Sequence, residues 1–195
     1  MSEPKIAPAP RHVAELALAC VEYVRRSIDA SLDWTPETLP LLDAWLKQTR
    51  GENRPELMQL VAPTVGAYFG EVLRRVFPSR WFAPEGAPAS WRLELEGCFL
   101  YFNPVGMAVE AVQLEDTEGL GASIAIAEDL VDDLRAHLEA TEPVRLEDYY
   151  LLTTRYEVID QIVHFLMVRG PARSPDETSP AAYEAHVAHD APADA

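Results

Sequence analysis

The densest group of chemically capable side chains lies between Gly66 and Trp81. Glu71 precedes Arg74 and Arg75 by three and four residues, and Tyr68 precedes Glu71 by three. Residues at these separations are neighbours on a helix surface, so this carboxylate could bind a cation or act as a base. A surface ion pair beside a tightly packed helix face explains the same residues without a ligand. We favour this second interpretation, because structural ion pairs are far commoner than catalytic carboxylates.

Asp160 and His164 form the second candidate pair, four residues apart on an apolar helix expected over residues 147–168. A carboxylate at this spacing can orient an imidazole and shift its pKa. A core histidine held by a neighbouring carboxylate explains the pair without catalysis. We therefore keep Asp160 and His164, like Glu71, Arg74, Arg75 and Tyr68, as candidate ligand-binding residues and predict no catalytic residue.

The sequence supports a metal site or a nucleophilic residue less well than it supports these two candidate pairs. Asp129, Asp133 and His137 recur every four residues, a spacing that can bind a divalent metal, but a solvated acidic helix face explains them better. Cys20 and Cys98 are the only cysteines, and we expect both to be buried and reduced. The sequence therefore predicts no metal site and no cofactor.

Residues 32–39, with the sequence LDWTPETL, are followed by GAYFGEVL at residues 66–73 and then by Trp81. This combination resembles a loose group of small bacterial proteins of unknown function. The similarity covers roughly residues 32–113. It implies a bacterial origin, and it implies no activity, ligand or catalytic residue.

Hydrophobic periodicity predicts an α+β fold with N-terminal helices, a central antiparallel sheet of three to four strands, and two C-terminal helices packed on it. The expected helices cover residues 12–32, a segment from Thr35 or Thr38 to Gly51, and residues 55–77, 128–140 and 147–168. The expected strands cover residues 91–96, 98–102 and 107–114, with a possible fourth at 122–126. Residues 78–90 read as a turn-rich connector.

The third expected helix carries small residues four apart, at Ala62, Gly66 and Gly70. Glycine destabilises a helix by about 1 kcal/mol relative to alanine, so a compensating contact is expected. We predict that another backbone approaches closely along this side of the helix. Pro63 should kink the helix or restart it.

Three segments are expected along the chain: a flexible leader at residues 1–10, a single domain at 11–169, and a tail at 170–195. The tail is rich in Ala, Pro, Ser and acidic residues. It has too few apolar side chains to offset its ordering entropy. We therefore expect an acidic, disordered tail that contributes almost nothing to stability.

Thirty-two acidic residues against sixteen basic ones give the chain a net charge of -16. This charge repels phosphate backbones and anionic lipids, so neither nucleic acid nor membrane is expected as a partner. The composition predicts a cytoplasmic protein of unspecified oligomeric state. The leading hypothesis is a non-catalytic partner-binding or regulatory module, an adaptor or an immunity-type protein that masks a basic partner. The alternative is an enzyme or small-ligand binder with a cleft around Glu71 or around Asp160 and His164.

Overall fold

The computed structural model describes residues 8–50, 55–117, 122–140, 144–145, 147–169 and 176–190. The predicted fold class is confirmed, because helices at both ends of the chain enclose one antiparallel sheet. The α-helices of the described residues are α1 Arg11–Ile28, α2 Leu39–Arg50, α3 Pro55–Val76, α4 Pro104–Gln113, α5 Val131–Glu139, α6 Leu152–Arg169 and α7 Pro180–Asp190. Short 3-10 turns precede α2, β2 and α5, at Pro36–Thr38, Pro88–Ser90 and Glu128–Leu130.

The sheet consists of four short strands in the order β1-β2-β3-β4, and each neighbouring pair is antiparallel. The strands are β1 Ser79–Phe82, β2 Arg92–Leu95, β3 Leu100–Phe102 and β4 Ala125–Ile126. Consecutive strands are neighbours in space, as short connections favour. The longest connection, between β3 and β4, contains α4.

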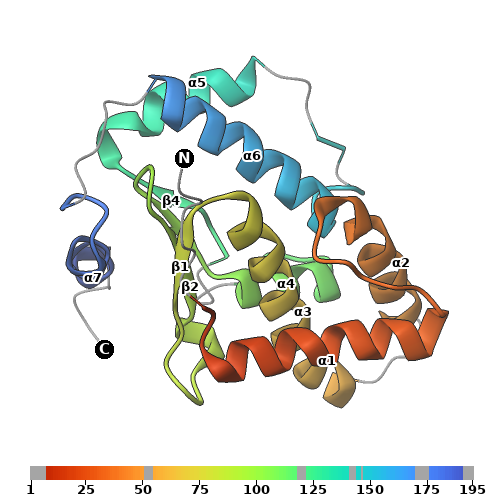
Figure 1. Cartoon of the computed structure of the whole chain (residues 1–195). Coiled ribbons are helices and arrows are strands. Elements are labelled where there is room, and N and C mark those ends of the chain that lie inside the picture. The colour runs from red at the N-terminus through yellow and green to blue at the C-terminus, as the bar shows by residue number, and fades with distance from the viewer. Residues whose placement is uncertain are drawn as a thin grey trace, which may run out of the picture.

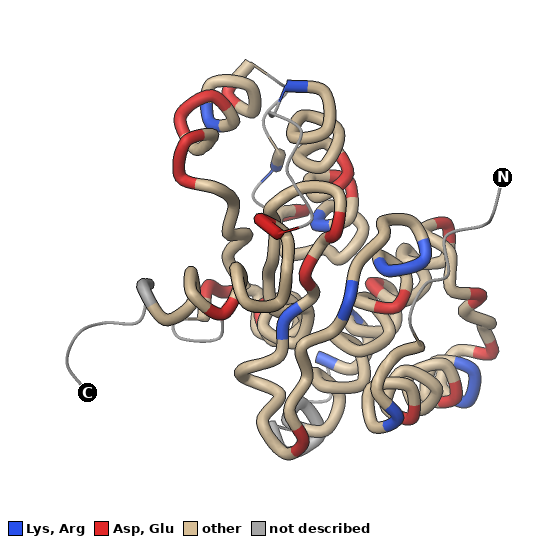
Figure 2. The backbone as a smooth tube through the Cα atoms, turned by 60° about the vertical axis from the view of Figure 1, so that its left-hand side comes forward, with Lys and Arg blue, Asp and Glu red and all other residues tan. Residues whose placement is uncertain are grey.

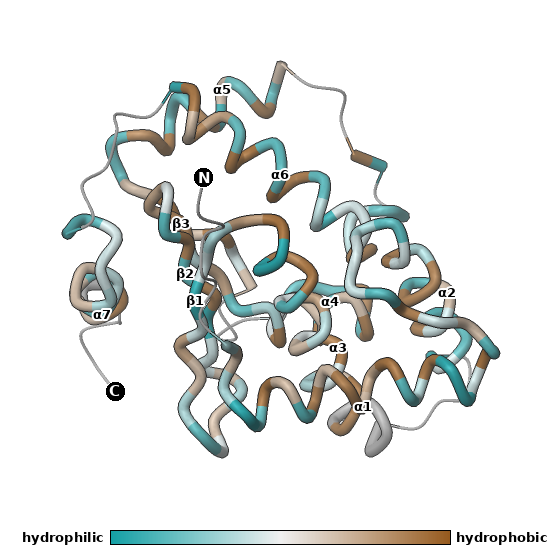
Figure 3. Tube along the Cα trace, viewed as in Figure 1, coloured by the Kyte–Doolittle hydropathy of each residue, from teal (hydrophilic) through white to brown (hydrophobic). Residues whose placement is uncertain are grey.

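The sheet separates two parts of the molecule (Figure 1). α1, α3 and α4 lie on one side of it, and α7 lies on the other. The buried apolar side chains of α1, α2, α3, α4, α6 and the strands form one cluster on the first side. Hydrophobic and hydrophilic residues alternate along α1, α2 and α6 (Figure 3), as expected for helices that bury one face. None of the described helices is long and apolar enough to cross a bilayer.

The prediction of a strand at residues 107–114 is wrong, because this segment forms the end of α4. Asn103 caps the helix by accepting a 2.8 Å hydrogen bond from the backbone N–H of Val105, and Pro104 occupies the first turn. α4 is buried over almost its whole circumference. Its apolar run therefore lacks a helical period, and such a run cannot be distinguished from a buried strand by pattern.

The segment at residues 78–90 is more than a connector, because its first part forms β1. Trp81 pairs with Leu93 and Arg80 with Glu94 across the β1–β2 ladder. Residues 8–10 of the expected leader precede α1 without regular structure, and residues 1–7 lie outside the described residues.

The prediction of a disordered tail is wrong for residues 176–190. This segment includes α7, and the side chain of Tyr183 is completely buried on the sheet. The prediction rested on the low apolar content of the tail. The burial and hydrogen bonds of one large aromatic side chain, Tyr183, are enough to order this segment. Residues 170–175 and 191–195 lie outside the described residues.

The close approach expected at the small residues of α3 is found at Gly66. A Cβ atom on Gly66 would lie 2.5 Å from Cα of Val105 and 2.7 Å from its backbone N. The absence of a side chain therefore lets the N-terminus of α4 rest directly on α3. The helix continues through Pro63 without a fresh start.

The start of α6 is held by Asp43 on α2. The Asp43 carboxylate accepts hydrogen bonds from the backbone N–H groups of Leu152 and Thr153, at 2.8 and 3.0 Å, and from the Thr153 hydroxyl at 2.6 Å. These donors would otherwise be unpaired at a helix N-terminus. Burial raises the pKa of Asp43, although the hydrogen bonds act in the opposite direction.

The position of Tyr183 predicts that the tail stabilises the fold. Replacing Tyr183 by Ala should lower the free energy of unfolding by on the order of 3 kcal/mol, because a large buried aromatic side chain is lost. Urea denaturation measures this difference. Tyr23→Ala is the matched control, since Tyr23 is 44% exposed and its loss should change stability by well under about 1 kcal/mol. Equal stability of the two variants would contradict the docking of α7.

The contact at Gly66 predicts a strong effect of a single methyl group. Gly66→Ala should destabilise the protein by about 1–3 kcal/mol, because the α4 backbone cannot move away without disturbing the core. Gly97→Ala is the control, since a Cβ there meets only the side chain of Met167, which is flexible and 59% exposed. Thermal denaturation of both variants provides the test. A neutral or stabilising Gly66→Ala would show that α4 is free to shift.

Candidate functional site

Glu71 lies in a buried polar cluster between α3 and β1. Its Oε1 atom accepts hydrogen bonds from Nε of Arg74 at 2.7 Å and from Nε1 of Trp81 at 2.8 Å. Its Oε2 atom accepts from Nη2 of Arg74 at 2.7 Å. Both carboxylate oxygens are therefore occupied by donors of the protein itself. Such a carboxylate is poorly placed to take a proton from a substrate.

The interpretation of Glu71 and Arg74 as a surface ion pair is wrong, because both residues are buried. The indole of Trp81 covers the pair from β1, a strand that the periodicity did not reveal. The same ring fills the space beside Gly70, where a Cβ atom would overlap it. At Gly70 the close neighbour is thus a side chain, whereas at Gly66 it is a backbone.

Tyr68 and Arg75 point to a different environment, around Trp34. The Tyr68 hydroxyl accepts a hydrogen bond from the backbone N–H of Trp34 at 3.1 Å and lies 3.1 Å from Oγ1 of Thr38. Arg75 is exposed, and its guanidinium stacks over the Trp34 ring at 4.5 Å from the centroid. The structure therefore joins Glu71 to Arg74 and places Tyr68 and Arg75 with Trp34.

The interpretation of His164 as a core histidine is also wrong. His164 and Asp160 are both exposed on α6, on the side opposite its buried residues. Four cavities lined by described residues lie elsewhere, and none of these four is lined by Glu71, Asp160 or His164. None of these four cavities is therefore a cleft around Glu71 or around Asp160 and His164.

The acidic helix face at residues 129–137 is solvent-exposed, as predicted, and His137 stacks on Phe165 with 4.9 Å between ring centroids. Among the described residues, no group of three or more His, Cys, Asp or Glu side chains is placed to hold a metal ion. Cys20 and Cys98 are both free and buried. Burial raises the pKa of both thiols, that of Cys98 to about 11, so neither is a ready nucleophile.

An ion pair that the sequence analysis missed lines the first cavity, of about 560 Å³, between α4 and α6. Nη2 of Arg155 donates to Oε2 of Glu110 at 2.8 Å, and the guanidinium lies 4.6 Å from the Tyr149 ring centroid. Oε1 of Glu110 accepts from the backbone N–H of Thr117 at 3.2 Å. Only the correct assignment of α4 as a helix could have placed Glu110 opposite α6.

A second cavity, of about 610 Å³, is an apolar groove between β4, α5 and α7, which we call the α5 groove. It is lined by Ile124, Ala125, Ile126, Glu128, Val131, Leu134, Arg135, Leu138, Glu139 and His186. The sequence predicts that Val131 and Leu138 are buried, but Val131 is 37% exposed and Leu138 is only half-buried. The apolar face of α5 is thus partly uncovered.

Two acidic residues, Glu128 and Glu139, line the α5 groove together with Arg135, and further acidic residues follow on the same helix. Residues 128–139 contain five acidic side chains and one arginine, Arg135, which is paired with Asp132 at 3.0 Å. Figure 2 shows the acidic residues following one another along this helix at the top of the molecule. The groove therefore combines an apolar floor with a negatively charged rim.

We compared the chain with protein-family models, with curated proteins and with solved structures, and none of the three comparisons found a match. The resemblance to small bacterial proteins stays a prediction, and only the geometry of the chain informs its function.

The burial of Glu71 predicts a structural role that a surface pair would not have. Glu71→Gln should lower the free energy of unfolding by about 3 kcal/mol, because it removes the negative charge that accepts two hydrogen bonds from the buried guanidinium of Arg74. The double variant Glu71→Gln/Arg74→Met should recover part of this loss, since the buried guanidinium is removed as well. Urea denaturation of both variants decides the matter. An unchanged or more stable Glu71→Gln protein would contradict the structural role and favour a ligand at this position.

Proposed function

We propose that this chain is a non-catalytic, cytoplasmic partner-binding module that holds a basic, amphipathic helix of a partner protein in the α5 groove. The observation that carries the proposal is the apolar floor within an acidic rim. Helix-in-groove recognition requires an apolar groove for a few anchor side chains and charges that complement the flanks of the bound helix. Both requirements are met by the described residues of β4 and α5.

The arginines inside the fold are paired with carboxylates there and do not offset the acidic side chains of α5. Arg74 and Arg92 are buried in ion pairs with interior carboxylates, and Arg155 is nearly buried against Glu110. These arginines are thus neutralised inside the fold, whereas the acidic side chains of α5 face the solvent. A rim of this sign attracts Lys and Arg and accelerates association with a basic partner.

The alternative, a small-ligand binder, is favoured by the cavity at Glu110 and Arg155 rather than by Glu71, Asp160 or His164. The Nε atom of Arg155 and Oγ1 of Thr117 have no hydrogen-bond partner within the described residues. Both atoms are buried, however, and Glu110 already neutralises the guanidinium. This cavity thus offers a ligand fewer accessible groups than the α5 groove offers a peptide, and we place it second.

The proposal predicts binding of a synthetic amphipathic peptide with Leu on one helical face and Lys on the other. Calorimetric titration should show binding that weakens as salt is added, because salt screens the rim charges. Val131→Asn and Glu139→Lys should each weaken binding about tenfold, the loss expected for about 1.4 kcal/mol of contact free energy.

Leu18→Asn is the matched control, since Leu18 is 59% exposed on α1 and does not line the groove. The same peptide with Glu in place of Lys should not bind. The proposal fails if the Glu-containing peptide binds equally well, or if the groove variants bind the Lys-containing peptide as tightly as the unmodified chain does.

A further inference from the structure

The outer face of the sheet carries two arginines around one carboxylate. Arg80 on β1 donates from Nε to Oε2 of Glu94 at 2.8 Å, and Arg92 on β2 donates from Nε to Oε1 of Glu94 at 2.7 Å. This surface, which we call the arginine face, therefore has one positive charge in excess. It is an exception in a chain whose net charge is -16.

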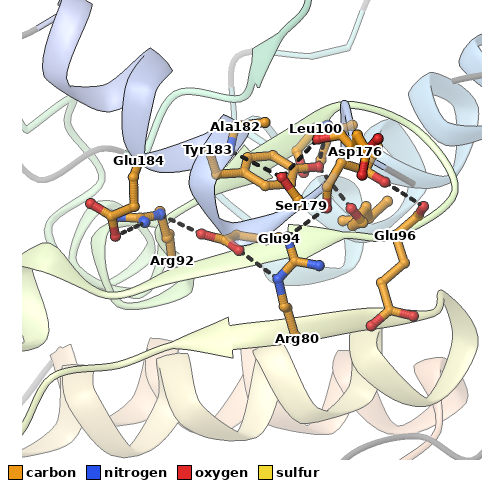
Figure 4. Close-up of polar contacts among 12 residues, drawn as sticks. Arg80, Arg92, Glu94, Glu96, Leu100, Asp176, Ser179, Ala182, Tyr183 and Glu184 are labelled. Atoms are coloured by element: carbon orange, nitrogen blue, oxygen red, sulfur yellow. Dashed lines mark hydrogen bonds and ion pairs between the residues drawn. The ribbon is translucent and has the colours of Figure 1, made fainter. Parts of the chain in front are cut away.

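α7 and the residues before it cover the arginine face and supply a negative charge and hydrogen-bond acceptors for its arginines (Figure 4). Glu184 accepts a 2.7 Å hydrogen bond from Nη2 of Arg92 and balances the second positive charge. Nη2 of Arg80 donates to the backbone carbonyl of Thr178 at 2.6 Å. Residues 176–190 thus accept one further hydrogen bond from each of the two arginines.

Tyr183 provides the main anchor. Its hydroxyl lies 2.7 Å from the carbonyl oxygen of Leu95 and accepts from the backbone N–H of Leu100 at 3.2 Å, so it contacts the backbone of both central strands. Its ring stacks on Phe99 with 4.5 Å between centroids and meets Tyr101 edge-on. These contacts recognise a tyrosine by both its ring and its hydroxyl.

Few other side chains of this segment are buried. Within residues 176–188, whose side chains are described, only Tyr183 and Thr178 are buried. A helix of this length is marginal on its own in water, so its order depends on this small set of contacts. Such a segment opens more easily than the core helices do.

The residue pattern of β2 is typical of a sheet whose outer face is exposed to water. Trp91, Leu93 and Leu95 point into the core, whereas Arg92 and Glu94 occupy the outer face, the alternation typical of a sheet with one solvated side. The structure buries this polar side under α7. An apolar face would suit a permanent cover better, because buried ion pairs repay their desolvation poorly. The arginine face is therefore compatible with both a covered and an uncovered state.

We propose that the arginine face is a second recognition surface, for an acidic partner helix with consecutive Tyr and Glu residues, and that α7 occupies this surface in the isolated chain. The proposal goes beyond the α5 groove, because the two surfaces differ in position and charge. A partner helix with the same Tyr–Glu pair displaces α7 and inherits its contacts with Arg92 and with the backbone of β2 and β3.

The test uses a fluorescent peptide with the sequence of residues 176–190 and the full-length chain carrying Tyr183→Ala. Loss of the anchor uncovers the arginine face, so this variant should bind the peptide at least about tenfold more tightly than the unmodified chain, where α7 competes. Fluorescence anisotropy measures both affinities. A peptide with Ala in place of Tyr should not bind, and adding Arg92→Gln to the variant should weaken binding of the original peptide.

Glu184→Arg is a second way to uncover the face, because it places a positive charge against Arg92 and leaves the core side of the sheet unchanged. Circular dichroism confirms that each variant is folded. Absence of peptide binding to both variants, or equal binding to the variants and the unmodified chain, overturns the proposal. Dimerisation of the unmodified chain with exchange of α7 between copies would overturn the assignment to a partner protein and replace it with a second copy.

Discussion

The close contact between α3 and α4 at Gly66 positions most of the molecule. Because Gly66 has no side chain, the first turn of α4 can rest on the α3 backbone, and Asn103 can cap that turn. The amide of Asn103 also donates to the carbonyls of Pro88 and Ala89, so the cap fixes the segment that leads into β2. At the other end, α4 carries Glu110 to Arg155 on α6. One missing side chain thus sets the spacing between the helical layer, the sheet and the last core helix.

The interior contains charged side chains, and each of the three carboxylates is buried together with an arginine. Glu71 with Arg74, Glu94 with two arginines, and Glu110 with Arg155 are largely satisfied by hydrogen bonds, which makes their burial tolerable. Each of these groups buries positive and negative charge together, so the net charge of the surface is little changed. The acidic character of α5 comes from its own sequence, in which residues 128–139 contain five acidic side chains and one arginine.

The two proposed surfaces meet at α7. His186 lines the α5 groove and at the same time packs its ring against Phe99 and Tyr101, next to the arginine face. Release of α7 would uncover the arginine face and remove one wall of the groove in the same step. The adaptor role that we propose requires such a link between two recognition surfaces.

Local patterns in the sequence were sufficient for the elements that bury one face. The periodicity of Val13, Ala17, Cys20 and Val24 defines α1, and the alternation of Leu93 and Leu95 with Arg92 and Glu94 defines β2. The α+β class follows in the same way, because a helix or strand repeats its burial at its own period. The burial of the two cysteines follows from the apolar character of a reduced thiol. The small residues of α3 likewise predicted a close approach.

Only the tertiary structure decided what covers the other faces. α4 is surrounded by apolar neighbours and so lost its period, which made it look like a strand. Glu71 is buried because Trp81 packs on it from β1. Arg92 and Glu94 are covered by α7, whose Glu184 binds Arg92 from about ninety residues later in the chain. For the same reason the sequence placed the candidate site at Glu71 and His164 and gave no sign of the α5 groove or the arginine face. A local pattern reports how one element divides its own residues between core and solvent, whereas a cover or a groove is made by segments that meet only after folding.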